Sequence, residues 1–253
     1  MKEKRKAPLA RIPRLTRGQK LARNLICCVL LAALLFAGLL YSGVISRVPL
    51  PLEWRFRLAE RRALLQPGEI VARLSVEDAI YWDADGGFPT LDEWGDQDAT
   101  AKWSFAHSQF RDARFLLGRS PGWLHIYESG FLNRLTAALP AGPGDVSAYL
   151  YLIHFNGDGP ELAPLVVYSD LPAARVEAEL AVRGEDGNTV LRGSRETEDG
   201  ACLLIAEREE EELPPEASFT GSDYWLRVRL MDKNGAVLAE RSGNVGYRGG
   251  WIE

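Results

Sequence analysis

The sequence predicts a single N-terminal transmembrane helix followed by a mainly-β extracytoplasmic part, which ends in an immunoglobulin-like antiparallel β-sandwich. Three observations support this fold class: an uncharged apolar segment near the N-terminus, short alternating runs towards the C-terminus, and turn sequences between those runs. A smaller membrane-proximal α+β module is expected between them. With 253 residues and 46% hydrophobic composition, the chain can bury one large core or two small ones.

The transmembrane helix is predicted at residues 24–46, NLICCVLLAALLFAGLLYSGVIS. This segment contains no charged residue, and at 1.5 Å per residue a helix of its length crosses a hydrocarbon core of roughly 30 Å. The apolar core of a signal peptide is usually about 7–15 residues long, so we expect an uncleaved signal-anchor. A cleaved signal sequence that ends near Ser46 is the alternative.

Charge is distributed unevenly along the chain. Residues 1–23 form a basic tail with nine Lys and Arg and one acidic residue, Glu3, whereas residues 47–253 carry 21 Lys and Arg and 34 Asp and Glu. Positive charge that precedes a membrane segment favours a cytoplasmic N-terminus. The sequence thus predicts a single-pass protein of the plasma membrane with its C-terminal domain outside. Membrane lipid is the expected partner of the basic tail, and no nucleic acid is expected.

The cysteine and asparagine patterns indicate the compartment. Only Cys202 lies outside the membrane segment, so the outer part is expected to have no internal disulfide. No Asn-x-Ser/Thr glycosylation acceptor occurs in the chain. Both observations favour a bacterial cell envelope over a eukaryotic secretory pathway.

Residues 47–145 are predicted to form the membrane-proximal module. An amphipathic helix is expected over residues 52–66, with Trp54, Leu58 and Leu65 on one side and a stop at Pro67-Gly68. Residues 69–82 fit either a strand or a short helix. Residues 90–93, TLDE, can form a capping box that begins a helix. Residues 114–130 are expected to form two strands, and the loop 140–145, PAGPGD, is the predicted boundary.

Residues 146–247 are predicted to form the sandwich, and residues 248–253 a C-terminal tail. Seven apolar or alternating runs occur in this region, and ARVEAELAVR (174–183) alternates with the period of two that is typical of a half-buried strand. The sequences GEDGN (184–188) and DKNG (232–235) are expected to be hairpin turns. This spacing of strands and turns suggests an immunoglobulin-like sandwich, although the Cys-Trp-Cys pattern of antibody domains is absent.

The main candidate for a ligand site is the acidic, aromatic stretch IYWDADGGFPTLDEWGDQD, residues 80–98. Its spacing excludes an EF-hand, because a loop that starts at Asp83 places Trp94 where the bidentate acid is required. Exposed tryptophan beside carboxylates suits a sugar, whereas a solvated loop pinned by buried rings is the simpler interpretation. The candidate ligand-binding residues are Trp82, Asp83, Asp85, Asp92, Trp94 and Asp96.

No catalytic residue, metal site or cofactor is predicted. Gly118-Arg-Ser120-Pro-Gly122 matches the G-x-S-x-G elbow of hydrolases, but Pro121 has no N–H to donate to an oxyanion. We therefore expect a hairpin turn there. The histidines 107, 125 and 154 lack metal-ligand spacing, and Cys202 is expected to be a small buried apolar residue.

The leading functional prediction is a non-enzymatic envelope protein that binds or scaffolds an unknown extracytoplasmic protein or glycan. The alternative is a glycan-active enzyme or a lectin-like module that uses the acidic, tryptophan-rich stretch 77–103. Glycoside chemistry requires two carboxyl groups at a defined separation, which a sequence does not show.

Overall fold

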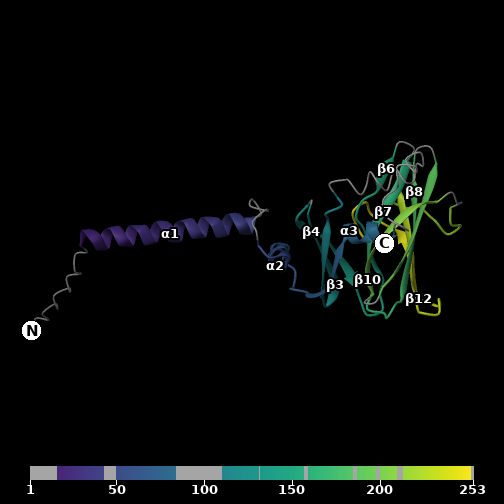
Figure 1. Ribbon diagram of the computed structural model, residues 1–253, viewed down its shortest axis with the longest axis horizontal. Coiled ribbons are helices and arrows are strands. Elements are labelled where there is room, and N and C mark those ends of the chain that lie inside the picture. The colour runs from purple at the N-terminus through teal and green to yellow at the C-terminus, as the bar shows by residue number, and fades with distance from the viewer. Residues whose placement is uncertain are drawn as a thin grey trace, which may run out of the picture. The chain divides into compact units, whose positions relative to one another are not determined.

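The computed structural model describes residues 16–42, 50–83, 110–130, 132–156, 159–184, 187–197, 200–209 and 213–251. The chain divides into two compact units, Met1–Pro49 and Leu50–Glu253 (Figure 1). In the described residues the first unit consists of one helix, and the second contains two short helices and all the strands.

Helix α1 (Arg17–Ser42) is long and apolar enough to cross a membrane. It begins seven residues before the predicted start because a capping box forms at its N-terminus. The hydroxyl of Thr16 accepts from the N–H of Gln19 at 3.3 Å, and the Gln19 side chain accepts from the N–H of Thr16 at 3.0 Å. The predicted end at residue 46 lies outside the described residues.

The second unit is mostly antiparallel β structure. A four-stranded sheet has the order β1-β2-β3-β4, and an eight-stranded sheet has the order β12-β11-β8-β9-β10-β7-β5, with β6 paired to β7. The strands of the first sheet are β1 (Glu69–Ser75), β2 (Arg114–Ser120), β3 (Gly122–Ser129) and β4 (Arg134–Ala141). Those of the second are β5 (Ser147–Leu150), β6 (His154–Asn156), β7 (Gly159–Tyr168), β8 (Arg175–Arg183), β9 (Asn188–Glu196), β10 (Ala201–Glu209), β11 (Tyr224–Met231) and β12 (Val237–Asn244).

Most of the local predictions are confirmed. All seven runs of the C-terminal region are strands, and the first run contains both β5 and β6. The segment 69–82 is first a strand and then a helix, α3 (Val76–Asp83). Residues 114–130 form a hairpin whose turn is Pro121-Gly122, with Gly122 at φ 77°. The predicted capping box at residues 90–93 lies outside the described residues.

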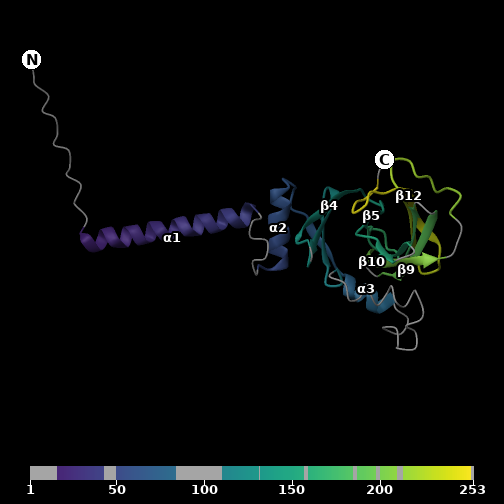
Figure 2. The same cartoon turned by 90° about the horizontal axis from the view of Figure 1, so that it is seen from above.

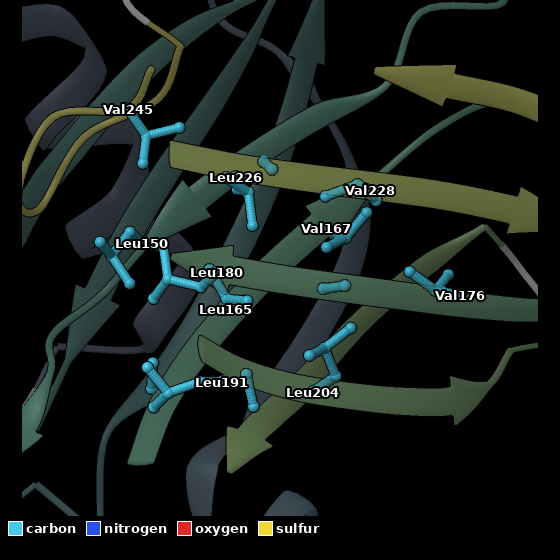
Figure 3. Packing of buried hydrophobic residues seen from close by; sticks show 14 of the residues in the cluster. Leu150, Leu165, Val167, Val176, Leu180, Leu191, Leu204, Leu226, Val228 and Val245 are labelled. Carbon is cyan, nitrogen blue, oxygen red and sulfur yellow. The ribbon is translucent and has the colours of Figure 1, made fainter. Parts of the chain in front are cut away.

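The eight-stranded sheet curls around a hydrophobic core. Side chains from β5, β7, β8, β9, β10 and β11 meet in one cluster, which includes Leu165, Leu180, Leu204 and Leu226 (Figure 3). Strand β9 pairs with β8 along its whole length but with β10 only at three positions, from Val190 to Arg192. The sheet therefore bends at β9, and β5, β7 and β10 form a wall that faces β8 and β11 across the core.

The C-terminal segment connects the two end strands of this curled sheet. Val245 bridges Trp251, and the N–H of Leu150, at the end of β5, donates to Gly249 O at 3.2 Å. Arg241 of β12 donates to Val146 O at 3.2 Å. Residues up to Trp251 thus belong to the packed fold.

A second core joins the two sheets. Phe115, Leu117 and Ile126 of the four-stranded sheet pack in one cluster with Tyr149, Val166 and Leu203 of the eight-stranded sheet. Strand β7 is thus buried on both faces, which explains its continuous apolar sequence. Helix α3 packs against β1 and β10 beside this core (Figure 2). The region predicted as a membrane-proximal module therefore shares one compact unit with the strands that follow it.

Helix α2 (Leu52–Arg62) covers the other face of the four-stranded sheet. The helix was expected, but its buried side is Phe56 and Glu60, opposite Trp54, whose side chain is 67% exposed. The ring of Phe56 packs with Leu116 and Tyr127. A Cβ on Gly118 would lie 2.4 Å from this ring, so the absence of a side chain at Gly118 lets α2 approach the sheet.

Candidate functional site

The structure does not bring the predicted ligand residues into a describable site. Trp82 and Asp83 lie at the end of α3, and nothing is described of their side chains. The other four residues lie outside the described part of the chain, and they are Asp85, Asp92, Trp94 and Asp96. Their role in ligand binding stays a prediction. Within the described ranges, no group of three His, Cys, Asp or Glu side chains could hold a metal ion.

A buried polar cluster joins α2 to the β2–β3 hairpin. The carboxylate of Glu60 is completely buried, and its Oε1 accepts from the N–H of Gly68 at 2.9 Å and lies 2.7 Å from His125 Nδ1. Its Oε2 accepts from Arg57 at 3.0 Å. The other ring nitrogen of His125, Nε2, lies 3.2 Å from Ser120 Oγ. Every heteroatom of these buried groups thus has a partner, which is what buried polar side chains require.

The sequence of contacts Ser120–His125–Glu60 resembles that of a hydrolytic triad, but two features argue against catalysis. Ser120 is only 7% exposed, so a substrate has little access to its hydroxyl. Pro121 follows it and cannot donate to an oxyanion. The predicted hairpin turn is confirmed, and the cluster is best explained as the contact that holds α2 on the sheet.

This cluster was missed from the sequence. The sequence did contain a sign that Glu60 is buried: it follows Phe56 by four residues and therefore lies on the same face of the helix. His125 is hydrogen-bonded within strand β3, and the predicted burial of Cys202 is confirmed, in the core of the eight-stranded sheet. What the sequence did not show is that the partner of His125 lies 65 residues away.

The outer face of β8, β9 and β11, together with Glu209 at the end of β10, contains a charged groove of about 480 Å³. Alternate residues of a strand point to the same side, so the charged side chains of the groove face away from the core, whereas Ala178, which also lines it, belongs to the core. The groove contains more arginine than glutamate and no aromatic residue. The lining residues are Arg175, Glu177, Ala178, Glu179, Arg192, Gly193, Ser194, Glu209, Arg227 and Arg229.

Glu179 is the centre of the charges in the groove. It stands directly opposite Arg192 on β9 and Arg227 on β11. Its Oε1 lies 2.5 Å from Arg192 Nη2, and its Oε2 pairs with Arg227. Because Glu179 is buried, these two pairs offset the cost of removing its charge from water. The arginines also contact outer carboxylates: Arg192 lies 3.2 Å from Glu209. Positive and negative side chains therefore alternate across the groove, and ion pairs hold them in place.

Another ion pair links the two sheets. Arg119 of β2 lies 2.9 Å from Asp170, which follows β7, and Asp170 also accepts from the N–H of Gly144 at 2.8 Å. Two contacts hold the pKa of Asp170 below its ordinary value. The hydrogen bond from the Gly144 N–H has the larger effect, and the Arg119 guanidinium has a smaller one. Both contacts favour the ionised carboxylate.

The stability of the second unit should depend on Asp170 in acid. A depressed pKa contributes stability above the ordinary aspartate pKa, and this stability is lost as the pH falls through the lower, folded-state pKa. Asp170→Asn removes the titrating group, so the variant should be less stable at neutral pH and should lose less stability between about pH 4 and its acid transition. Thermal melting against pH measures this difference. Asp112→Asn, at an exposed side chain, is the control, and equal acid sensitivity of both variants would contradict the assignment.

No known protein family, curated protein or solved structure matches the chain. Its own features define it as a protein with one N-terminal helix that can cross a membrane and a mostly antiparallel β unit of curled sheets. The charged groove on β8, β9 and β11 is larger than a second hollow of about 210 Å³ that Arg73, Asp78 and Arg195 help to line.

Proposed function

We propose that this chain is a single-pass protein of a bacterial plasma membrane, with its N-terminus in the cytoplasm, that binds an envelope protein through the groove of β8, β9 and β11. Helix α1 is the signal-anchor, and the basic tail contacts anionic lipid on the cytoplasmic side. The outer unit is a binding or scaffolding domain. The groove carries this proposal, because it combines a volume of about 480 Å³ with charges that ion pairs hold on β8, β9 and β11.

We further propose that the eight-stranded sheet is an immunoglobulin-like sandwich. The strand order supports this, since β5, β7 and β10 are neighbours on one wall and β9, β8, β11 and β12 are neighbours on the other. The connections β7–β8 and β10–β11 pass between the walls, as Greek-key connections do in such domains. In this arrangement the groove lies on the outer face of the wall that contains β8 and β11.

A protein partner suits the groove better than a glycan does. Sugar-binding sites use aromatic faces as platforms, and none of the groove's lining residues is aromatic. Arginine has five N–H donors, so a guanidinium that already contacts one carboxylate can donate to a second oxygen. Arg229 is such a group: it contacts Glu240 at 2.9 Å through Nε. We expect the partner to present carboxylates or backbone carbonyls to β11.

The alternative of a glycan-active enzyme or a lectin-like module depends on residues 77–103. A glycan-retention assay with Trp94→Ala separates it from the main proposal, since the groove does not include this residue.

Crosslinking from the groove should capture one defined envelope protein. A photo-crosslinking amino acid at Ser194, an exposed groove position, is expected to give a discrete adduct in cells. The same amino acid at Phe155, which is 55% exposed on β6, should not give this adduct. Adducts of equal yield from both positions, or none from Ser194, would remove the groove as the binding face.

Arg229→Glu, in the chain that carries the crosslinker at Ser194, tests the charge. We expect the adduct to fall by at least about tenfold, because a reversed charge at an interface costs several kcal/mol. The matched control is Arg229→Glu with Glu240→Arg, which restores the ion pair between β11 and β12. If the control recovers stability but not the adduct, recognition requires the positive charge on β11. Recovery of both would show that only folding was affected.

A further inference from the structure

The outer side of α2 exposes apolar residues that its packing on the sheet does not require. Among the large hydrophobic side chains described in residues 50–253, Trp54 at 67% and Leu64 at 90% are the two most exposed. Trp54 lies on the helix side opposite the buried Phe56 and Glu60. Leu58, four residues after Trp54, shares its side and is half-buried. The helix thus has a second apolar side that faces away from the protein.

Leu64 is not exposed because the end of α2 is frayed, since hydrogen bonds close this end of the helix. The N–H of Leu64 donates to Arg61 O at 3.1 Å, and the N–H of Leu65 donates to Glu60 O at 2.9 Å, which is the Schellman termination. Leu64 itself has φ 57°, where glycine is the preferred residue. The chain therefore carries a strained leucine in solvent at a position that glycine would occupy without strain.

Charge on the same side of α2 is positive. Arg61 and Arg62 are exposed, and neither forms an ion pair with another described residue. The remaining arginines of the helix are engaged, since Arg57 contacts Glu60 and Arg55 donates to Asn133 at 2.9 Å. Tryptophan and leucine flanked by unpaired arginine form the composition of a helix that lies in a lipid headgroup region.

The length of the chain restricts what this side can meet. Nine residues separate Ser42, the end of α1, from Leu52, the start of α2. Even fully extended, a connection of this length spans only about 30–35 Å. If α1 crosses a membrane as proposed, α2 begins within this chain length of the end of the crossing helix.

We infer that the surface formed by Trp54, Leu58, Arg61, Arg62 and Leu64 lies in the headgroup region of the bilayer that α1 crosses. This inference rests on the proposed membrane anchor. Trp54 and Leu64 enter the interface, and Arg61 and Arg62 contact lipid phosphates. The β-rich unit is then held against the outer leaflet through α2, whose opposite side is fixed to the sheet by Phe56 and Glu60.

Thiol accessibility in the full chain tests this inference. Cys27, Cys28 and Cys202 are replaced by alanine, and a single cysteine is introduced as Leu64→Cys or, for the control, as Phe155→Cys. Each chain is placed in nanodiscs of phosphatidylcholine, with or without phosphatidylglycerol, and its reaction with a charged, membrane-impermeant maleimide is timed. Exposure alone would make position 64 the faster, because Leu64 is 90% exposed and Phe155 is 55% exposed.

We expect the order to be reversed, with the thiol at position 64 reacting about tenfold more slowly than that at position 155, a factor that corresponds to roughly 1.4 kcal/mol. Phosphatidylglycerol should increase the difference, and Arg61→Gln with Arg62→Gln should abolish that increase. A thiol at position 64 that reacts as fast as the one at position 155 in both lipids would overturn the inference.

A chain that retains only Cys27 shows which hypothesis is wrong if the thiol at position 64 reacts freely: the placement of α2 at the bilayer surface, or the crossing of the bilayer by α1. Cys27 lies within α1 and should be protected in nanodiscs if α1 crosses the bilayer. Protection at Cys27 with free reaction at position 64 would overturn only the placement of α2. Free reaction at both positions would overturn the anchor, and with it the proposed membrane attachment.

Discussion

Glu60→Ala is expected to lower the free energy of unfolding of the second unit by about 3–5 kcal/mol, because two buried donors lose their acceptor at about 1–3 kcal/mol each. The substitution leaves the N–H of Gly68 and Nδ1 of His125 buried without their acceptor, and Arg57 without its carboxylate. For a unit of this size the loss corresponds to a fall in melting temperature of roughly 10 °C. Denaturation of the full chain in detergent micelles, followed by tryptophan fluorescence, measures it.

Glu53→Ala is the matched control, on the same helix. Glu53 pairs with Arg73 at the surface, where an ion pair contributes at most about 1 kcal/mol. Hydrogen exchange should show that Glu60→Ala exposes the amides of α2 first, since the helix loses its polar contact with the hairpin. Equal destabilisation by both variants would contradict the role assigned to Glu60.

Gly193→Val is expected to destabilise the curled sheet by about 3 kcal/mol, at the upper end of the range for overpacking. A Cβ at this position would lie 2.4 Å from Ile205 O and 2.9 Å from Ile205 C. Both atoms belong to the backbone, so no side-chain movement relieves the collision, and β9 must separate from β10 where the sheet bends. Because Gly193 also lines the groove, the adduct from Ser194 should be lost as well.

Ser194→Val tests whether the loss of stability in Gly193→Val comes from the contact between position 193 and the backbone of Ile205. The side chain of Ser194 is exposed next to Gly193 on the same strand, so valine there should change the free energy of unfolding by less than about 0.5 kcal/mol. A similar loss at both positions would show that β9 tolerates no larger residue for other reasons, and that the contact with Ile205 is not decisive.

The strands were predictable where one face of a strand meets solvent. In β8 and β11 the inward residues, such as Val176 and Val228, alternate with outward charges, so the period of two is visible in the sequence. The hairpin turns were predictable because glycine marks positive φ, as at Gly235. The uncharged run predicted a helix that is long and apolar enough to cross a membrane, whereas the start of this helix depended on the cap at Thr16.

Long-range pairing explains what the sequence did not show. That the four-stranded sheet packs on the outer face of β7 depends on contacts such as that between Arg119 and Asp170, which are 51 residues apart. The groove combines residues of β8, β9 and β11, and no local spacing marks them as neighbours. The burial of Glu60 could not be predicted from its helix position alone, because a buried carboxylate is stable only beside partners that a sequence does not place. The sites predicted within residues 80–98 stay untested by the described structure.

The attachment of α2 has a mechanical consequence. The polypeptide passes from α1 to the sheets only through α2, so under the proposed function any tension between the membrane and a bound partner is transmitted through α2. The contacts of Phe56 and Glu60 with the β2–β3 hairpin would bear this tension. If these contacts broke, the segment from α2 to β1 would extend, while the eight-stranded sheet, which does not depend on them, would keep its shape. The buried contacts of Glu60 would then set the force at which α2 separates from the sheet.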